Sequence, residues 1–436
     1  MKTLECRNII FNNQDTKICI SITGRNNEEI IEQAERIKKR KPDIVEWRAD
    51  YYQIENEEKD TATLIYELEE LHKVLKEIPM IFTFRNKEEG GERQVDFETY
   101  KSYCSHVAAV AEKNNVALID LEAYGKKDED GIGELIRYIH ECNVKIIGSN
   151  HHFDKTPSED EMFEILSGME AMGADVCKLA VMPEEKEDVQ ALMDVSKKAD
   201  EILNVPIVTM SMGELGAVTR VCTRLTGSVL TFAAGENASA PGQLDSTVVR
   251  ELLEIGKGCD LDCNIALIGF MGTGKTTISK ALSRITGFDE IDVDHYIVEK
   301  EEMAISDIFE KYGEQHFRNL ETQALEEIQK GKGKIISCGG GAVLRDENVD
   351  ILKKNGVIVL LTATPETIFE RVKDNTSRPI LNNDMSIEHV KELMGDREPR
   401  YQSVADIKVN VDSNDRVLTC HDMLKKLKQS GHLTVK

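Results

Sequence analysis

The segment Gly-Phe-Met-Gly-Thr-Gly-Lys-Thr at residues 269–276 has the composition of a loop that binds phosphate groups. It matches G-x4-G-K-[ST], and it follows an apolar run and precedes a helical pattern, as this motif requires. Backbone N–H groups of such a loop surround phosphate oxygens, and the next helix N-terminus adds positive potential. Lys275 would reach the β- and γ-phosphates of ATP, and Thr276 would ligate Mg²⁺. The predicted nucleotide contacts are Gly269, Gly272, Thr273, Gly274, Lys275, Thr276 and Thr277.

Polar residues after this loop have spacings that suit a site for the phosphoryl acceptor. Asp292 and Asp294 lie two residues apart at a predicted strand end, which would direct both carboxylates to one face. Arg318 lies three residues before Glu321 on a predicted helix. The glycines at 339–341 end another strand with bare backbone. Two structural alternatives remain open: Asp292 as a strand-end cap, and Glu321 only as a brace for Arg318.

A different chemistry is indicated by Lys178, which lies inside an apolar run. Burial disfavours a charged amine and lowers its pKa. A neutral amine at a strand end can attack a ketone to form an imine, whose protonated form acidifies the neighbouring carbon and favours β-elimination. His151, at the end of another apolar run, is placed as the acid–base partner. The alternative is a lysine that extends to solvent.

The first half of the chain predicts a (β/α)8 barrel. Its apolar runs alternate with segments of helical periodicity and lie at residues 18–22, 44–47, 80–84, 116–121, 145–148, 175–180, 206–210 and 229–233. Barrel sites lie at the C-terminal ends of the strands. Polar residues cluster there, namely Glu46, Arg48, Arg85, Glu122, His151, Lys178 and Ser211. Residues 3–12 predict a further strand pair that closes the bottom of the barrel.

The second half predicts a P-loop domain with three α/β/α layers and a central parallel sheet. Its expected strands are 264–268, 290–293, 334–338, 357–361 and 407–411. We therefore expect a barrel at residues 1–255, a linker at 256–262 and the P-loop domain at 263–436.

Bulk properties exclude several classes of protein. The formal net charge of −24 argues against nucleic acid or an anionic membrane as a partner. No apolar stretch approaches ~18 residues, and the N-terminus lacks a signal core. The ten cysteines form no CxxC pair, which favours a reduced cytoplasmic protein.

Residues 1–255 resemble type I 3-dehydroquinate dehydratase. The shared motifs are Glu46-Trp-Arg48, Phe82-Thr-Phe-Arg85, Glu88-Glu-Gly-Gly91, Ser149-Asn-His151, Cys177-Lys178-Leu-Ala-Val-Met-Pro183, Thr209-Met-Ser-Met212 with Arg220, and Ala238-Ser239-Ala-Pro-Gly-Gln243. The resemblance implies metal-free dehydration of 3-dehydroquinate to 3-dehydroshikimate and a homodimer formed through the barrel. His152 departs from the family pattern, which more often has Asp or Asn there.

The same resemblance implies roles for individual residues. Lys178 would form the Schiff base, and His151, oriented by Glu89, would remove the proton and assist loss of water. Arg220 would bind the substrate carboxylate, under a loop at 235–244. The residues expected to hold hydroxyls or the carboxylate are Ser21, Glu46, Arg48, Arg85, Ser239 and Gln243.

Residues 262–436 resemble shikimate kinase, which implies phosphoryl transfer from MgATP to the 3-hydroxyl of shikimate. Asp294 would bind the shikimate hydroxyls and act as base, and Asp292 would lie near Mg²⁺. Arg378, in a lid at about 374–384, would close over the phosphates. The residues expected to hold shikimate besides Asp294 are Arg318, Gly340, Gly341 and Arg397. Arg400 departs from the family pattern, where an apolar residue is expected.

Both resemblances together predict a bifunctional enzyme of the shikimate pathway. No G-x-G-x-x-G follows a strand, so another protein would supply the intervening nicotinamide-dependent reduction. One alternative is a class I aldolase barrel fused to a kinase for another small hydroxy acid. A second is a nucleotide sensor without catalysis, although a sensor needs no acceptor pocket.

Overall fold

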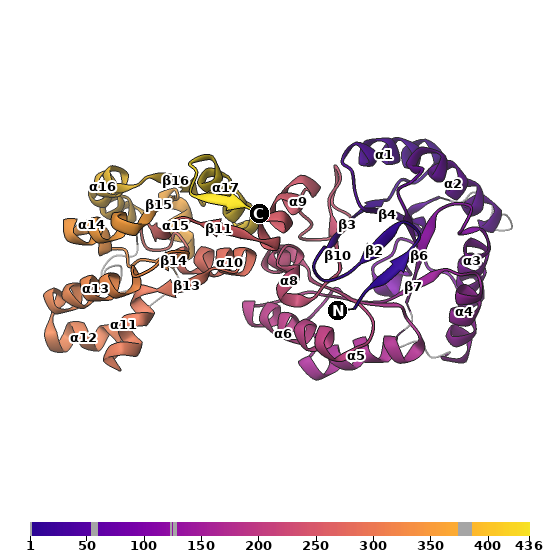
Figure 1. Ribbon diagram of the computed structural model, residues 1–436, viewed down its shortest axis with the longest axis horizontal. Coiled ribbons are helices and arrows are strands. Elements are labelled where there is room, and N and C mark those ends of the chain that lie inside the picture. The colour runs from indigo at the N-terminus through magenta and orange to yellow at the C-terminus, as the bar shows by residue number, and fades with distance from the viewer. Residues whose placement is uncertain (1, 54–59, 123, 125–128, 374–385) are drawn as a thin grey trace. The chain divides into compact units, whose positions relative to one another are not determined.

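The computed structural model describes residues 2–53, 60–122, 124, 129–373 and 386–436. The chain divides into two compact units, Met1–Lys257 and Gly258–Lys436, which are described separately (Figure 1). Residues 256–262, the expected linker, contain the end of helix α9 (Ser246–Lys257) and strand β11 (Cys259–Leu261). Among the described helices, none combines the length and the apolar character needed to cross a bilayer.

The first unit is a nearly closed parallel barrel. Its strands follow the order β10-β3-β4-β5-β6-β7-β8-β9, and a parallel bridge from Ile207 to Ser228 joins the two edges. All eight predicted strands form. The strands are β3 (Lys17–Ile22), β4 (Ile44–Arg48), β5 (Met80–Thr83), β6 (Val116–Leu121), β7 (Lys145–His152), β8 (Val176–Val181), β9 (Ile207–Ser211) and β10 (Leu230–Ala233).

Helices surround these strands, as Figure 1 shows. They are α1 (Asn27–Lys39), α2 (Asp60–Leu75), α3 (Phe97–Val110), α4 (Glu129–Glu141), α5 (Glu159–Met172), α6 (Lys186–Ile202), α7 (Gly213–Gly216), α8 (Thr223–Thr226) and α9. Local sequence fixes their starts: at α5 the Ser158 hydroxyl accepts the Glu161 N–H, and the Glu161 carboxylate accepts the Ser158 N–H.

A hairpin precedes the barrel, as the sequence predicts. Strand β1 (Leu4–Cys6) pairs antiparallel with β2 (Ile9–Phe11). Cys6, Ile9 and Phe11 are buried in one cluster with residues near the starts of the barrel strands, such as Cys19 and Ile44. The hairpin therefore closes the end of the barrel opposite to the expected site.

The second unit has a five-stranded parallel sheet in the order β13-β14-β12-β15-β16. The strands are β12 (Asn264–Ile268), β13 (Asp289–Asp292), β14 (Lys334–Ser337), β15 (Gly356–Thr362) and β16 (Ile407–Asn410), each within one residue of its predicted range. A separate strand, β17 (Leu433–Val435), pairs antiparallel with β11.

The crossover from β12 to β13 runs along the sheet in the direction opposite to all later crossovers. Because parallel crossovers are right-handed, helices lie on both faces of this sheet. Helix α10 connects β12 to β13 and packs against α17, whereas α13 and α14 connect strands in the opposite direction and pack together. The helices are α10 (Lys275–Thr286), α11 (Val293–Glu301), α12 (Ile305–Tyr312), α13 (Glu314–Ile328), α14 (Asp346–Asn355), α15 (Pro365–Val372), α16 (Ile387–Val404) and α17 (Arg416–Gln429). The predicted three-layer architecture is thus confirmed.

Candidate active sites

A cavity of about 80 Å³ lies where the barrel strands end. The predicted residues that line it are Glu46, Arg48, Arg85, Glu89, His151, Lys178, Arg220, Ser239 and Gln243. Ser21 lies just behind them: its hydroxyl donates to Glu46 Oε2 (2.6 Å) and accepts from the Ser239 hydroxyl (3.2 Å). Residues from separate strands and loops are therefore gathered at one site. Phe153, next to the motif, also lines the cavity, whereas His152 does not.

Lys178, on β8, is only 4% exposed and has a partner that the sequence reasoning missed. Its Nζ lies 3.2 Å from Asp120 Oδ2 and 4.5 Å from the centre of the Phe232 ring. The Asp120 Oδ1 accepts from Arg85 Nη2 (2.7 Å) and from the Ser149 hydroxyl (2.6 Å). Burial raises the pKa of Asp120, but the charges of Arg85 and Lys178 outweigh burial and hold that pKa below its ordinary value. The buried lysine is thus ion-paired and does not extend to solvent.

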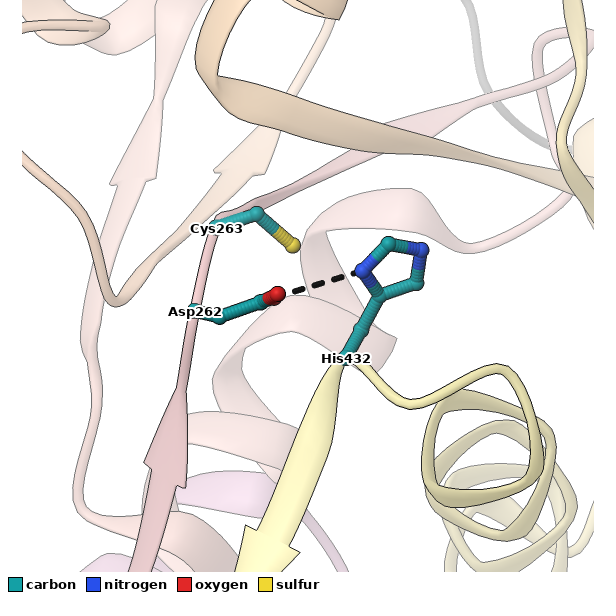
Figure 2. A group of neighbouring side chains, drawn as sticks. All are labelled: Asp262, Cys263 and His432. Carbon is teal, nitrogen blue, oxygen red and sulfur yellow. Dashed lines mark hydrogen bonds and ion pairs between the residues drawn. The ribbon is translucent and has the colours of Figure 1, made fainter.

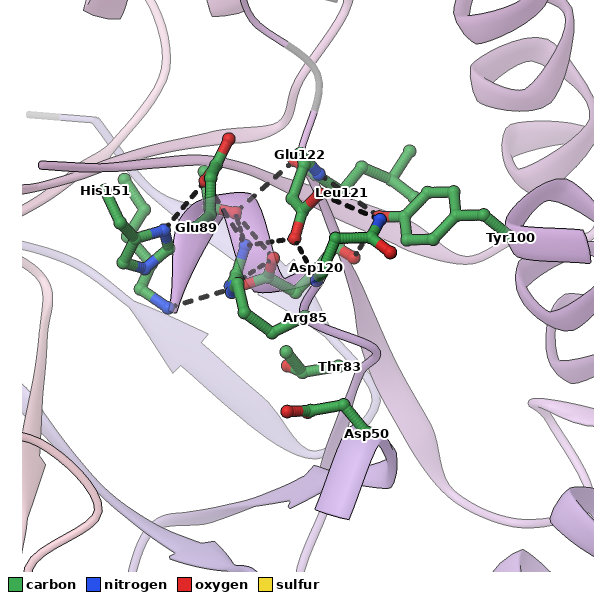
Figure 3. A network of polar contacts seen from close by, with 12 residues as sticks. Asp50, Thr83, Arg85, Glu89, Tyr100, Asp120, Leu121, Glu122 and His151 are labelled. Atoms are coloured by element: carbon green, nitrogen blue, oxygen red, sulfur yellow. Dashed lines mark hydrogen bonds and ion pairs between the residues drawn. The ribbon is translucent and has the colours of Figure 1, made fainter. Parts of the chain in front are cut away.

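Arg85 is the centre of a larger buried network (Figure 3). Besides Asp120, its guanidinium lies 3.6 Å from Glu122 Oε1 and 3.7 Å from Glu89 Oε2. Burial lowers the pKa of Arg85, and the surrounding carboxylates more than reverse this, so the pKa is raised. Glu122 is itself fixed by the backbone N–H of Asn86 at 2.7 Å. The network therefore holds Arg85 as a permanent cation beside the cavity.

His151 lies at the end of β7, with Nδ1 3.0 Å from Glu89 Oε2. A carboxylate only accepts hydrogen bonds, so Nδ1 carries the proton and Nε2 keeps its lone pair. The Phe153 ring stacks on the imidazole with centroids 6.2 Å apart. Burial, followed by the charges of Arg85 and Lys178, lowers the pKa of His151 well below its ordinary value. The imidazole is therefore neutral and suited to accept a proton.

Arg220 is a buried cation without a carboxylate partner among the described residues. Its Nη2 donates to Pro241 O (3.1 Å) and its Nη1 to Phe232 O (3.4 Å), while Nε has no partner in that part of the chain. Burial lowers the pKa of Arg220 to about 10. A desolvated guanidinium that lines a cavity and lacks a counter-ion is suited to an anionic ligand.

Arg48 and Glu46 are held by internal partners. Arg48 donates from Nε and Nη2 to the two carboxylate oxygens of buried Asp50, both at 2.8 Å. Glu46 accepts from the hydroxyls of Ser21 and Thr83. Both side chains are thus fixed in place at the cavity wall.

The second unit has a cavity of about 550 Å³ beside the phosphate loop. Its lining residues are Met271, Gly272, Gly274, Lys275, Thr276, Thr277, Asp292, Asp294, Ser337, Cys338, Gly339, Gly340 and Arg371. Gly272 has φ +81°, and a Cβ there would lie 2.8 Å from Val372 Cγ1, so the loop conformation requires glycine. Thr273 is buried, and its hydroxyl bonds to Phe270 O inside the loop.

Three oxygen groups meet at one wall of this cavity. The hydroxyls of Thr276 and Ser337 donate to Asp292 Oδ2 at 2.7 and 2.9 Å. Lys275 Nζ donates to the carbonyl oxygens of Gly269 (2.9 Å) and Phe270 (3.2 Å). Mg²⁺ prefers oxygen ligands such as hydroxyl and carboxylate groups, so Thr276, Ser337 and Asp292 fit that ion.

The expectation that Asp292 and Asp294 share one strand face is wrong. Strand β13 ends at Asp292, whose carboxylate caps α11 by accepting the N–H groups of Asp294 (3.1 Å) and His295 (3.2 Å). Aspartate is a preferred N-cap, and this local preference overrides continuation of the strand. Both carboxylates nevertheless line the cavity. Burial, with a further contribution from Asp292, raises the pKa of Asp294.

The expected acceptor residues lie around Gly340 and Gly341. Arg318 pairs with buried Glu321 at 3.0 Å, as the spacing predicted, and the Tyr401 hydroxyl donates to Gly340 O at 2.6 Å. The Arg397 guanidinium lies 5.8 Å from the Phe270 ring centre. The residues that line the cavity include Gly340, but not Gly341, Arg318 or Arg397.

Two further expectations concern arginines. Arg378, with the expected lid at 374–384, lies outside the described residues. Arg400, the departure from the family pattern, donates to Val343 O (2.7 Å) and to Asp346 Oδ1 (2.6 Å), so it tethers α16 to the start of α14.

Comparisons with known proteins cover both units. The chain matches the model of the family Type I 3-dehydroquinase over residues 18–259 and that of the family Shikimate kinase over residues 271–428. It is 37% identical over 255 residues to the 3-dehydroquinate dehydratase of Listeria monocytogenes serotype 4b (strain F2365), covering 58% of this chain and 98% of that protein.

Solved structures are also similar to parts of this chain. The 3-dehydroquinate dehydratase of Geobacillus kaustophilus HTA426 is 33% identical, with a TM-score of 0.54, and covers 58% of this chain and 96% of its own. Shikimate kinase from Acinetobacter baumannii, solved in complex with shikimate, is 32% identical, with a TM-score of 0.37. The match covers 38% of this chain and 94% of that protein. The chain therefore belongs to the type I 3-dehydroquinase family and carries, after that part, a second part that matches the shikimate kinase family.

Proposed function

We propose that the protein dehydrates 3-dehydroquinate to 3-dehydroshikimate through an imine on Lys178, and phosphorylates shikimate with MgATP. The observation that supports the first activity best is the composition of the barrel cavity. It combines the Lys178 amine, a neutral His151 and an Arg220 cation that lacks a carboxylate partner in the described part of the chain. The carboxylate of a small hydroxylated acid would supply the counter-ion for Arg220.

In the proposed dehydration, the Lys178 ammonium gives a proton to His151, and the neutral amine attacks the substrate ketone. His151 returns this proton to the former ketone oxygen, which leaves as water, and a protonated imine forms. His151 Nε2 then removes a proton from the carbon next to the imine. The resulting enamine expels the β-hydroxyl, to which His151 returns the proton, so water leaves. Hydrolysis of the imine releases the product and restores the amine, and the net change is the loss of one water.

Asp120 has a role in this proposal that the sequence did not indicate. Its carboxylate lies 3.2 Å from the Lys178 Nζ, the atom that carries positive charge first as ammonium and later as iminium. A fixed carboxylate beside this atom stabilises both cations without reorganisation. We therefore assign Asp120 as the counter-ion of the imine.

Reduction by borohydride tests this mechanism. Protein treated with borohydride and 3-dehydroquinate should gain a covalent adduct on Lys178, located by mass spectrometry of peptides, and should lose dehydratase activity only. An active protein in which Lys178 stays unmodified would overturn the imine.

For the second activity we propose that the phosphate loop holds ATP, that Thr276 and Asp292 hold Mg²⁺, and that Arg378 contacts the phosphates. Bound Mg²⁺ would neutralise charge on the β- and γ-phosphates. Asp294, whose pKa burial raises, would accept the hydroxyl proton of the acceptor. Arg318 and Arg397 would hold its carboxylate through bidentate contacts.

An acceptor panel tests the kinase proposal. With MgATP, the protein should phosphorylate shikimate much faster than gluconate or nucleoside monophosphates. Equal or faster turnover of either alternative would overturn the assignment of the acceptor.

We also propose a cytoplasmic homodimer formed through the barrel. The reducing compartment is proposed from the sequence, whose ten cysteines form no CxxC pair. Light scattering at several protein concentrations would measure the mass of the assembly, and a monomer throughout would contradict the dimer.

A further inference from the structure

Asp262, Cys263 and His432 form a cluster that neither proposed activity uses (Figure 2). Strands β11 and β17 pair antiparallel with Leu261 opposite Leu433, so the next pair in this register is Asp262 and His432. The pairing continues there, because the Asp262 N–H donates to His432 O at 3.3 Å. Cys263 follows directly, before β12 begins. The two strands thus bring the first and last segments of the second unit together at this cluster.

The cluster has the dimensions of a metal site. The His432 Nδ1 lies 3.2 Å from the Asp262 Oδ1, and the three possible ligand atoms, including Cys263 Sγ, all lie within 4.8 Å of one another. Ligand atoms around tetrahedral Zn²⁺ lie about 3.3–3.8 Å apart, given bonds of ~2.0–2.3 Å. Small side-chain rotations would therefore bring all three to one ion. In Figure 2 the sulfur and the Nδ1 both point toward the Asp262 carboxylate.

We propose that Asp262, Cys263 and His432 bind one thiophilic divalent ion, Zn²⁺, with water as the fourth ligand. A sulfur, an imidazole nitrogen and a carboxylate oxygen form a ligand set typical of zinc, whereas Mg²⁺ and Ca²⁺ require oxygen ligands. Cys263 is buried, but the side chains of Asp262 and His432 are 61% and 35% exposed. Solvent can therefore deliver both the ion and the fourth ligand.

This site is distinct from the proposed Mg²⁺ site. Cys263 immediately precedes β12 (Asn264–Ile268), and the phosphate loop begins at the other end of that strand. A strand of this length spans roughly 17 Å at ~3.3 Å per residue. The ion would thus lie near the N-terminal end of β12, whereas the proposed nucleotide site lies at the C-terminal end of this strand. There it would connect residues 262 and 263 to residue 432, closing a long loop and stabilising the folded unit.

Zinc titration of the intact, metal-free chain under reducing conditions tests the proposal. One equivalent of Zn²⁺ should bind, should persist in excess Mg²⁺ and MgATP, and should raise the unfolding temperature of the kinase unit. Co²⁺ in its place should give the visible and near-ultraviolet absorption of tetrahedral, thiolate-ligated cobalt.

Single substitutions locate the ion. Asp262→Asn, Cys263→Ser and His432→Gln should each weaken Zn²⁺ binding at least about tenfold, because each removes a ligand. Cys259→Ser, which removes a buried thiol from β11, should bind Zn²⁺ as the wild type does. Both enzymatic rates without Zn²⁺ should be unchanged in the two variants whose side chains are not buried, Asp262→Asn and His432→Gln. The proposal is overturned if wild-type protein binds no zinc, or if Asp262→Asn and His432→Gln retain its full affinity.

Discussion

Arg220 and Arg85 are both buried beside the barrel cavity, yet their surroundings are opposite. Arg85 contacts three carboxylates, whereas among the described residues Arg220 contacts backbone carbonyls and a methionine sulfur. Removing a paired buried charge leaves its partners uncompensated, whereas an unpaired buried charge costs folding free energy that an anionic ligand can offset. The two arginines should therefore respond differently to the same substitution.

Replacing Arg220 by Met should lower kcat/KM for 3-dehydroquinate by about 10²-fold or more, equivalent to ~2–3 kcal/mol for charge-assisted hydrogen bonds. The unfolding temperature should stay equal or rise, because an unpaired buried charge is lost. The matched variant Arg85→Met should destabilise the fold by ~3–5 kcal/mol, because it removes the buried cation that Asp120 and Glu122 share. Steady-state kinetics and thermal unfolding measure both effects, and a strongly destabilised Arg220→Met would contradict this account.

Asp120→Asn keeps the shape of the side chain but removes the charge opposite Lys178. We expect kcat of the dehydratase to fall about 10²-fold, as for loss of one preorganised electrostatic partner. The rate at which borohydride traps the imine should fall in parallel. Ser149→Ala, which removes a neutral donor to the same carboxylate, should have a much smaller effect on both rates. Equal effects of the two variants would argue against the role of the charge.

The pH dependence of the dehydratase should reflect His151. Its pKa is lowered by burial and by neighbouring cations, so the base stays neutral below the ordinary histidine value of ~6.5. The profile of kcat/KM, which reports the free enzyme, should therefore stay flat as pH falls through ~6.5 and decline only at lower pH. The same shift means that the unfolded chain binds the proton more readily, so His151 reduces stability as pH falls below ~6.5. An acid limb at or above pH ~6.5 would contradict the neutral, buried base.

At the scale of elements, apolar runs that alternate with helical periodicity were sufficient to predict the strands of both sheets. They failed where a local cap competed with the strand pattern, as at Asp292, which starts α11 and moves Asp294 onto a helix. The sequence patterns also missed residues whose importance depends on side chains from other strands. Asp120 is one polar residue in the apolar run at 116–121, and its role follows from lying opposite Lys178 and Arg85. Arg371 and Ser337 likewise carry no motif but line the cavity beside the phosphate loop.

The turn after β14 offers a test of the acceptor site. A Cβ on Gly341 would lie 2.5 Å from Arg318 Nη1, so Gly341→Ala must displace the guanidinium. We expect the KM for shikimate to rise about tenfold or more while the KM for ATP stays near the wild-type value. Gly395→Ala, inside α16, is the control and should leave both constants unchanged, because among the described residues the new Cβ has only the helix's own backbone and its chain neighbours within 4 Å. Equal changes in both KM values would indicate a general disturbance of the unit.

At the scale of the whole molecule, each unit has its own core. Among the described residues, one buried cluster lies within the kinase unit and three lie within the barrel. Ligands that bind only the folded state stabilise it by mass action. In calorimetry, MgATP should therefore raise the unfolding temperature of the kinase unit. The borohydride-trapped substrate should raise the temperature of a separate transition, that of the barrel. A single transition that both ligands shift would show that the units unfold as one.

The contact between Arg220 and Pro241 has a further consequence for the timing of catalysis. The cation assigned to the substrate carboxylate also donates to a carbonyl of the loop at 235–244, which lines the cavity through Ser239, Ala240 and Gln243. The Arg220 guanidinium would therefore have to release the product carboxylate, and it would also have to release Pro241 before the loop at 235–244 could open. A slow loop would retain the product after the imine is hydrolysed, so the turnover rate at saturating substrate would depend on solvent viscosity rather than on proton transfer.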